Sequence, residues 1–409
     1  MKTVLIVDPF STGKLYAPLL NARGVECIAV ISTPHLPKHF TNDLITENFK
    51  TVYVWHEALL NTFKTIAPNA VIAGCETAIY LTDYLTEKLG TRGNTRSTSD
   101  LRRNKLCMQL ALEQRGLANI ASQLLDSRAR IGDVVASLDE STSYVVKPLN
   151  SAATEGVVFA RGRNEVESAL KNAAWQQAND LGEINLGFIV QPFIAGPEYV
   201  VDMVAFEGAY VVASVCRYTK TAKNGSTFVY ESLDTLDPQA EHLKPLLDYA
   251  RRAAAALHIR VGPIHMEIIW AEDGPVMIEA GGRLHGGVAP LLFQQVYTPD
   301  LLSLAMDSYL GSPRPRNDAV SQFSHGRIGF FSADEQRTFD VPSAHVIQSV
   351  MTDPAYCGHR YFIEPGTITS VTIDFATCPG LFWIHHASKQ QLEVSSKSLR
   401  KRLWPSARP

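Results

Sequence analysis

The chain has 409 residues, of which 45% are hydrophobic and 19% charged, and its formal net charge is −3. These values are typical of a globular protein with two or three domains, and they exclude a collagen-like or Pro/Gly-rich disordered chain. The near-zero net charge also removes the electrostatic reason to expect a nucleic-acid partner.

The first hundred residues alternate between short apolar runs and stretches with helical spacing. Strands are predicted at Thr3–Val7, Cys27–Ile31, Thr51–Trp55 and Ala70–Ala73, with helices at Leu15–Arg23, Glu57–Ile66 and Thr77–Leu89. Strands that alternate with helices favour a Rossmann-like α/β layer with a parallel sheet. The ligands of such a layer bind at the carboxyl ends of its strands. We assign residues 1–100 to this first domain.

The rest of the chain is predicted to mix helices with antiparallel strands. A helix from about Asp100 to Gly116 carries Lys105, and further helices are expected at Glu165–Leu181 and Pro238–Ala256. Strands are expected at Tyr144–Pro148, Phe188–Gln191, Glu198–Phe206, Tyr210–Arg217, Ile264–Trp270 and Pro275–Glu279. After Pro315 we expect short β segments and a basic helical tail at Ser398–Arg402. The predicted units are residues 101–190 and 191–409.

Several features bear on where the protein works. No apolar run approaches the roughly 18–20 residues of a membrane span, so no membrane partner is expected. The opening run MKTVLIVDPF is too short for the apolar core of a signal peptide. The six cysteines are scattered without CxxC spacing, which favours reduced thiols over zinc ligands or disulfides. A cytoplasmic protein is therefore predicted.

The strongest local signal is the run HMEIIWAEDGPVMIEAGGR. If its turn centres on Asp273, then Trp270 faces Val276, Ile269 faces Met277, and Glu267 lies directly opposite Glu279. Directly opposed residues share a face with Cβ atoms about 4.5–5.5 Å apart, so two ionised carboxylates would repel unless they share a proton or a divalent cation. Oxygen ligands without clustered Cys or His favour Mg²⁺. The alternative is that one carboxylate is salt-bridged and the other exposed.

Two lysines and an arginine are candidates for holding an anion. Lys147 ends the apolar strand YVVKP and precedes the small-residue loop NSAATEG, whose backbone N–H groups could face phosphates. Lys105 lies on an amphipathic helix. Arg283 follows Glu279 by four residues among glycines, where its planar guanidinium could contact phosphate or carboxylate. Either lysine could instead be an ordinary surface cation, and neither segment has the P-loop pattern.

A strand–loop–strand of the form QPFIAGPEY places Gln191 and Glu198 on either side of a Gly-Pro connection. Such a segment could present backbone groups to adenine and a carboxylate to ribose hydroxyls. A glutamate beside a turn is also commonly a surface charge.

The order of these elements resembles the ATP-grasp superfamily. It runs from a helix lysine through a strand lysine, a hinge with a glutamate and paired glutamates to an arginine. The resemblance spans most of the chain and predicts an ATP-grasp fold with an N-terminal Rossmann-like domain and a C-terminal β-rich lid. Within the superfamily the runs GPIHMEII…IEAGGRLHGG and CPGLFWIHHASKQQLE are similar to the L-amino acid ligases that form dipeptides.

The resemblance implies a role for each matching residue. ATP would be bound by Lys105, Lys147, Gln191, Phe193, Ile194 and Glu198 and by a loop, Ser151–Gly156, that closes over the phosphates through Ser151, Thr154 and Gly156. Glu267 and Glu279 would bind Mg²⁺, which Mn²⁺ could replace, and Arg283 would stabilise the charged intermediate. Glu76, Asp234, His265, Gly286 and Gly287 would contact the substrates.

Three positions need comment. The run VYESLD resembles a ligase segment with a metal- or substrate-contacting glutamate followed, three residues on, by a histidine; here these positions are Glu231 and Asp234. Many ATP-grasp members have an asparagine two residues after the second metal glutamate, where this chain has Gly281, and Glu231 could supply the missing oxygen. Glu76 ends the strand AVIAGC and could instead be a surface strand-end glutamate.

The resemblance implies an ATP-dependent carboxylate–amine ligase. One amino acid would be activated as an acyl phosphate and attacked by the amine of a second, giving a dipeptide, ADP and phosphate. A homodimer is expected from the same resemblance. The rivals are another ATP-grasp ligase or carboxylase with different substrates, and an NAD-type regulatory protein, which the absence of GxGxxG after Val7 weakens.

Overall fold

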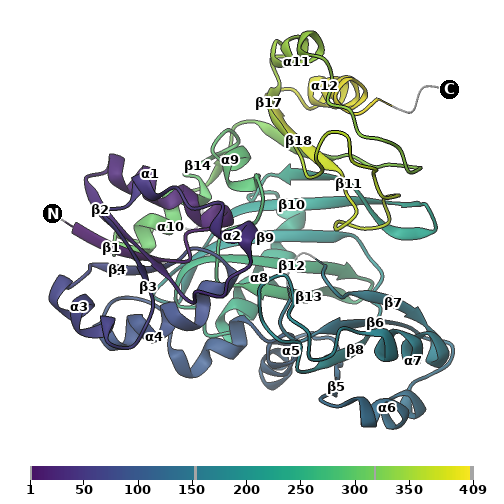
Figure 1. Ribbon diagram of the computed structural model, residues 1–409, viewed down its shortest axis with the longest axis horizontal. Coiled ribbons are helices and arrows are strands. Elements are labelled where there is room, and N and C mark those ends of the chain that lie inside the picture. The colour runs from purple at the N-terminus through teal and green to yellow at the C-terminus, as the bar shows by residue number, and fades with distance from the viewer. Residues whose placement is uncertain (1, 152–153, 317–318, 406–409) are drawn as a thin grey trace.

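The computed structural model describes residues 2–151, 154–316 and 319–405. Its chain builds three larger sheets and a small two-stranded one, with helices packed against the larger three (Figure 1). No helix in these described ranges is long and apolar enough to cross a membrane.

The N-terminal sheet is parallel, as its alternating sequence predicts. Its strand order is β3-β2-β1-β4. The strands are β1 (Lys2–Val7), β2 (Val25–Ile31), β3 (Thr51–Val54) and β4 (Ala70–Ala73), and the helices are α1 (Tyr16–Ala22), α2 (Lys38–Thr41), α3 (Leu59–Ile66) and α4 (Ile79–Leu89). The apolar residues of β1 and β4 are fully or almost fully buried, which explains their continuous apolar runs. The Rossmann-like prediction is confirmed.

A second, antiparallel sheet has the order β5-β8-β6-β7. It consists of β5 (Gln123–Leu125), β6 (Ser143–Pro148), β7 (Val158–Arg161) and β8 (Phe188–Pro192), with α6 (Ile131–Ser137) and α7 (Gly162–Asn172) packed on it. The predicted boundary at residue 190 falls inside β8. The helix predicted to reach Leu181 ends at Asn172. Further along, Asn179 accepts hydrogen bonds from the backbone of Leu181 and Glu183 and stabilises a turn in place of the predicted helix.

The third sheet has eight strands in the order β13-β12-β9-β10-β11-β16-β18-β17. The strands are β9 (Glu198–Phe206), β10 (Ala209–Lys223), β11 (Ser226–Leu236), β12 (Val261–Ala271), β13 (Gly274–Gly281), β16 (His325–Phe330), β17 (Tyr356–Tyr361) and β18 (Gly380–His386). α5 (Lys105–Gln114) and α8 (Lys244–Ala256) pack on one face of this sheet. α9 (Ala289–Phe293) and α10 (Leu301–Tyr309) pack on the other. β14 (Tyr297–Thr298) and β15 (Ser321–Gln322) form the small sheet.

Two parts of this architecture depart from the sequence-based expectation. β10 continues to Lys223 and returns as β11 through Asn224–Gly225, both with positive φ, a turn pair that strongly favours a hairpin. The C-terminal region contains helices α11 (Ala344–Met351) and α12 (Lys389–Leu403) besides its strands. α12 is much longer than the predicted basic tail. Its apolar side packs on β18 through residues such as Leu392 and Leu399.

The β12–β13 hairpin places its two glutamates opposite each other, as predicted, although part of the predicted register is wrong. The turn is tighter than expected, so Trp270 pairs with Pro275 and Ile269 with Val276. A bulge between the Glu267 and Ile268 pairs then adds one residue to β13. Because a one-residue shift moves a side chain to the other face, this bulge is what brings Glu279 onto the face of Glu267.

Candidate functional site

The two opposed glutamates lie on the face of the large sheet that is turned away from α8. Ile268 and Met277, their neighbours, point into the apolar core beneath α8. Glu279 contacts Lys105, whose Nζ lies 3.0 Å from Glu279 Oε2 and donates to Ser151 O at 2.7 Å. Lys105 begins α5, and the Asn104 side chain caps that helix by accepting from two backbone N–H groups. The helix lysine and the metal-type carboxylate are therefore brought together.

Lys147 joins this group from the second sheet. Its side chain is almost fully buried at 4% exposure, and it makes no hydrogen bond or ion pair with any residue in the described ranges. Burial lowers its pKa to about 8, against the opposing attraction of Glu279. A buried ammonium without a partner is costly unless an anion is bound. Lys147 and Lys105 therefore fit the phosphates of a nucleotide, and the opposed glutamates fit a divalent cation bound with it.

Glu267 is held by a buried polar cluster that the sequence did not predict as a unit. His265 Nε2 lies 3.5 Å from Glu267 Oε1, and its Nδ1 lies 3.0 Å from Asp202 Oδ1. His285 Nδ1 contacts the other oxygen of Asp202 at 3.0 Å. Burial favours a higher pKa for Glu267, but the hydrogen bond with His265 and the positive charges of His265, Lys220 and Arg283 together outweigh it and lower that pKa. Both ring nitrogens of His265 face protein carboxylates, so its predicted substrate contact stays a prediction.

The predicted ribose carboxylate, Glu198, has a cationic partner that was also missed. Lys220 Nζ lies 2.7 Å from Glu198 Oε2 and 4.4 Å from the centre of the Tyr230 ring. The charge of Lys220 helps to lower the pKa of Glu267, which places it beside the metal-type pair. The β-favouring residues Tyr218, Thr219 and Thr221 just beyond Arg217 were the signal that could have extended the strand past Lys220.

The predicted adenine side lies along the end of β8. Gln191 is buried and its Nε2 donates to Ser122 Oγ at 2.7 Å. Phe193 meets Phe159 edge to face with ring centres 5.2 Å apart. Ile194 is half-buried beside it. In the predicted loop Ser151 is buried, Thr154 and Gly156 are exposed with positive φ, and residues 152–153 lie outside the described ranges.

Arg283 and Glu76 are joined across 207 residues of sequence. Arg283 Nε donates to Glu76 Oε2 at 2.6 Å, and Arg103 binds Glu76 Oε1 at 2.6 Å. Burial favours a higher pKa for Glu76, but the two guanidinium groups outweigh it and lower that pKa to about 2. A Cβ on Gly281 would lie only 3.1 Å from Glu76 Oε2, so the glycine leaves room for this contact where an asparagine would crowd it.

The structure does not bring every predicted residue to this place. Glu231 is exposed on β11, and its backbone oxygen accepts a hydrogen bond from Arg400 of α12. In the described ranges no hydrogen bond or ion pair joins its carboxylate to Glu267 or Glu279. Asp234 accepts from Arg327 at 2.5 Å and from Ser232 at 2.7 Å. Its carboxylate is thus tied to β16, which leaves its substrate role a prediction.

Gly286 and Gly287 line open space. A Cβ at either position would meet no atom within 4 Å. Gly287 has a φ of +65°, however, so any side chain there strains the backbone even though there is room for it. Gly286 has no such restriction.

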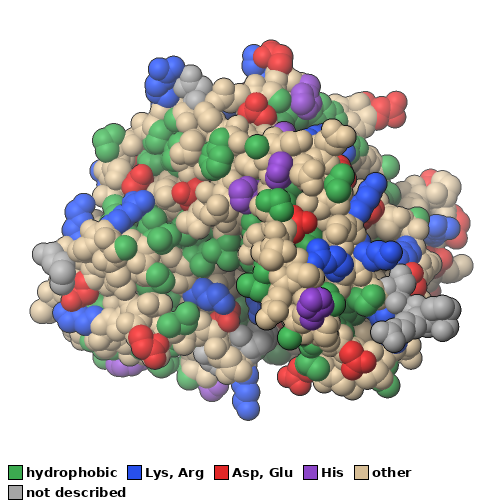
Figure 2. Space-filling model, turned by 90° about the horizontal axis from the view of Figure 1, so that it is seen from above, with side chains coloured by type: hydrophobic (Ala, Val, Ile, Leu, Met, Phe, Trp, Pro, Cys, Tyr) green, Lys and Arg blue, Asp and Glu red, His purple; other side chains and the backbone are tan. Residues whose placement is uncertain are grey.

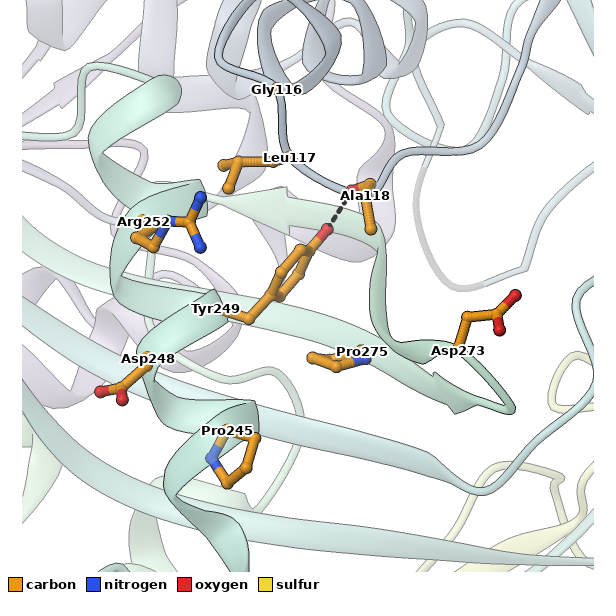
Figure 3. A pocket seen from close by; sticks show the side chains of 9 residues that line it. All are labelled: Gly116, Leu117, Ala118, Pro245, Asp248, Tyr249, Arg252, Asp273 and Pro275. Atoms are coloured by element: carbon orange, nitrogen blue, oxygen red, sulfur yellow. Dashed lines mark hydrogen bonds between the residues drawn. The ribbon is translucent and has the colours of Figure 1, made fainter.

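The surface has a cavity beside α8 and carries charges of both signs (Figure 2). A cavity of about 360 Å³ lies beside α8, lined by Tyr249, Arg252 and Pro275 among others, on the opposite face of the sheet from Glu267 (Figure 3). Lysines and arginines are interspersed with acidic residues on the face shown in Figure 2. Among the described residues this face has no continuous basic patch for an anionic ligand, so the candidate cations are the two buried lysines, Lys105 and Lys147.

The chain is similar to several known proteins. Residues 140–290 match the family described as the ATP-grasp domain. The chain is 27% identical over 392 residues to dapdiamide A synthase of Enterobacter agglomerans, covering 93% of this chain and 91% of that protein. The fold resembles an L-amino acid ligase from Bacillus licheniformis, with a TM-score of 0.76, 19% identity and 98% of both chains covered.

It also resembles N5-carboxyaminoimidazole ribonucleotide synthetase from Thermotoga maritima, with a TM-score of 0.70, 12% identity, and 98% and 99% of the two chains covered. Residues 140–290 therefore match an ATP-grasp domain, and the chain as a whole has the fold of these solved structures. Lys147, Glu198, Glu267, Glu279 and Arg283 all lie inside the matched segment, whereas Lys105 precedes it.

Proposed function

We propose that this protein is an ATP-dependent carboxylate–amine ligase that joins two amino acids. The observation that carries the proposal is the meeting of Lys105, Lys147, Glu267 and Glu279 beside an arginine, Arg283, that is held at the same end of the sheet. The names of the similar proteins support amide formation between amino acids over other ATP-grasp chemistry.

Each residue has a part in such a reaction. Lys105 and Lys147 bind the phosphates of ATP, and Glu198 reaches the ribose. Glu267 and Glu279 hold Mg²⁺ or Mn²⁺, which neutralises phosphate charge when bound. The carboxylate of the first amino acid attacks the γ-phosphate, giving an acyl phosphate and ADP. The amine of the second then attacks the carbonyl, and phosphate leaves.

Arg283 stabilises the charge that develops on the carbonyl oxygen. Its side chain is 17% exposed, so a fixed cation there acts in a partly dry site, where it is stronger than in water. Its Nε and Nη1 bind Glu76 and Leu284 O, and in the described ranges Nη2 has no partner. Nη2 is therefore the donor that can face the substrate.

The proposal is tested by measuring ADP and phosphate release with pairs of amino acids, followed by mass measurement of the products. A dipeptide mass with one ADP per bond is expected. Arg283→Lys is a second test. It keeps the positive charge but loses the planar guanidinium, so kcat should fall far more than the affinity for ATP.

ADP release that requires bicarbonate or a non-amino-acid acid, with no dipeptide formed, would favour the alternative of another ATP-grasp ligase or carboxylase. The fold similarity to the carboxyaminoimidazole ribonucleotide synthetase is the reason to include that arm.

A further inference from the structure

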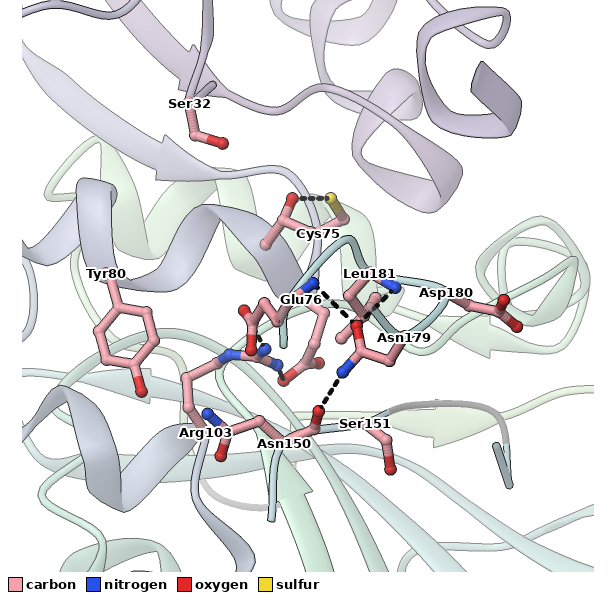
Figure 4. A network of polar contacts seen from close by, with 12 residues as sticks. Ser32, Cys75, Glu76, Tyr80, Arg103, Asn150, Ser151, Asn179, Asp180 and Leu181 are labelled. Carbon is pink, nitrogen blue, oxygen red and sulfur yellow. Dashed lines mark hydrogen bonds and ion pairs between the residues drawn. The ribbon is translucent and has the colours of Figure 1, made fainter. Parts of the chain in front are cut away.

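Arg103 belongs to a buried ionic chain that the proposed reaction does not yet use. Its Nη1 lies 2.6 Å from Glu76 Oε1 and its Nη2 lies 2.6 Å from Glu183 Oε1. Its side chain is 1% exposed. Figure 4 shows Arg103 between Glu76 and the turn that contains Asn179.

The chain of contacts joins four parts of the fold. Glu76 follows β4 of the parallel sheet, Arg103 immediately precedes the cap of α5, and Glu183 belongs to the turn before β8. Arg283 follows β13 of the large sheet. Arg283 is therefore linked, through Glu76, to Arg103, which lies outside the large sheet and outside the matched ATP-grasp segment.

The important feature is how the two oxygens of Glu76 are shared. Oε2 accepts from Arg283 Nε, while Oε1 accepts from Arg103. An arginine presents Nε and Nη2 side by side, and a carboxylate facing that edge usually takes both in a two-pronged contact. Here only Nε of Arg283 bonds to Glu76, because Arg103 occupies Oε1.

We infer that Arg103 is a positioning residue that keeps Arg283 Nη2 free for the substrate by occupying Glu76 Oε1. Without Arg103, Oε1 is a buried carboxylate oxygen that has lost its donor, and Nη2 of Arg283 is the adjacent donor. The carboxylate then rotates to bind both Nε and Nη2, and the oxyanion loses its cationic hydrogen bond. Glu183 anchors the other end of Arg103 and fixes the plane of its guanidinium.

The role of Nη2 towards the substrate rests on the proposed function. The expected rearrangement of Glu76 when Arg103 is removed does not. Arg103→Met should lower kcat about 10²-fold, the effect of removing one oxyanion donor, and leave the KM for ATP within about twofold. Arg103→Lys keeps one donor for Oε1 and should restore most of kcat. Arg92→Met, which removes an exposed arginine paired with Glu207, is the matched control and should behave as the unmodified protein.

A double-mutant cycle separates positioning from a general structural role. Arg283→Lys has no side-by-side donors, so adding Arg103→Met to it should lower kcat little further. Losses in kcat that multiply, or a parallel loss of ATP affinity in Arg103→Met, would overturn the inference. Thermal unfolding of Arg103→Met shows whether its fold persists, and Arg103→Ala, which removes the same donors, carries the test if Arg103→Met does not fold.

A crystal structure of Arg103→Met, or of Arg103→Ala if the former does not crystallise, tests the geometry without any activity. Glu76 bound to both Nε and Nη2 of Arg283 is expected. Glu76 still bound through Nε alone would refute the inference even if the ligase activity is real. Conversely, absence of ligase activity in the unmodified protein would refute the proposed function and leave this geometric result intact.

Discussion

Replacing Lys147 with methionine should make the protein without nucleotide more stable and at the same time weaken its binding of ATP. Lys147 is 4% exposed and has no hydrogen bond or ion pair in the described ranges. Burial lowers its pKa from 10.5 to about 8. Since a tenfold change in an equilibrium constant is about 1.4 kcal/mol, keeping Lys147 charged costs the fold about 3 kcal/mol.

The pH dependence of this cost has a definite sign. Between pH 8 and 10.5 the unfolded chain binds more protons at Lys147 than the folded chain does, so folding stability rises with pH across that window. The full cost is present below pH 8. The stabilisation of Lys147→Met should therefore be largest near pH 7 and disappear above pH 10.5.

Nucleotide should narrow this difference in stability by about 1.3–2.3 kcal/mol. A hydrogen bond from Lys147 to a charged phosphate is worth about 1.5–3 kcal/mol, so Lys147→Met should bind ATP about 10–100-fold more weakly. At 100 times its Kd, ATP stabilises the unmodified protein by about 2.7 kcal/mol, and the same concentration stabilises the variant by only about 0.4–1.4 kcal/mol.

The assay is chemical denaturation at pH 7 with and without ATP and Mg²⁺. Lys105→Met is the matched control, because Lys105 is paired with Glu279 and Ser151 O and its loss should destabilise the protein without nucleotide. If Lys147→Met is less stable than the unmodified protein without nucleotide, or binds ATP equally well, the reasoning about an unpartnered cation is wrong.

Three further predictions concern the cation, the substrate side chain and the backbone at Gly287. Glu267→Gln and Glu279→Gln should each abolish turnover while the fold is retained, and activity should disappear in excess chelator and return with Mg²⁺ or Mn²⁺; full turnover in chelator would contradict the assignment. Gly286→Trp fills open space beside Arg283 and should shift the carboxylate donor towards small amino acids, as measured by product masses from a donor panel, and an unchanged donor profile would count against a pocket there. At Gly287 even alanine should reduce folding stability by about 1 kcal/mol, because its φ of +65° favours glycine; thermal unfolding checks this against Gly286→Ala.

Much of the proposed phosphate and metal site follows from local sequence. Lys147 lies at the end of an apolar strand, where a buried cation favours a bound anion. The spacing of Glu267 and Glu279 about a short turn predicts that they face each other, and they do. These features depend on residues close together in the chain, where strand alternation and turn chemistry operate.

Even within this hairpin the sequence did not reveal the bulge in β13. The tighter turn alone would have turned Glu279 towards the core beneath α8, and the bulge at β13 compensates. Whether a strand bulges depends on how its partner and the underlying core are packed, which hydrophobic alternation does not reveal.

The reaction-centre contacts were decided by tertiary structure. Arg283 and Glu76 are 207 residues apart, Arg103 and Glu183 are 80 apart, and His285 reaches Asp202 across 83. Glu76 was predicted as a substrate contact and Lys220 was not predicted at all, because a lone charge carries no mark of its partner until burial forces a pairing. The sequence by itself determined which local segments could bind phosphate and metal. Only the packing of three sheets decided which buried charges neutralise one another, and hence which donor of Arg283 is left for the proposed substrate.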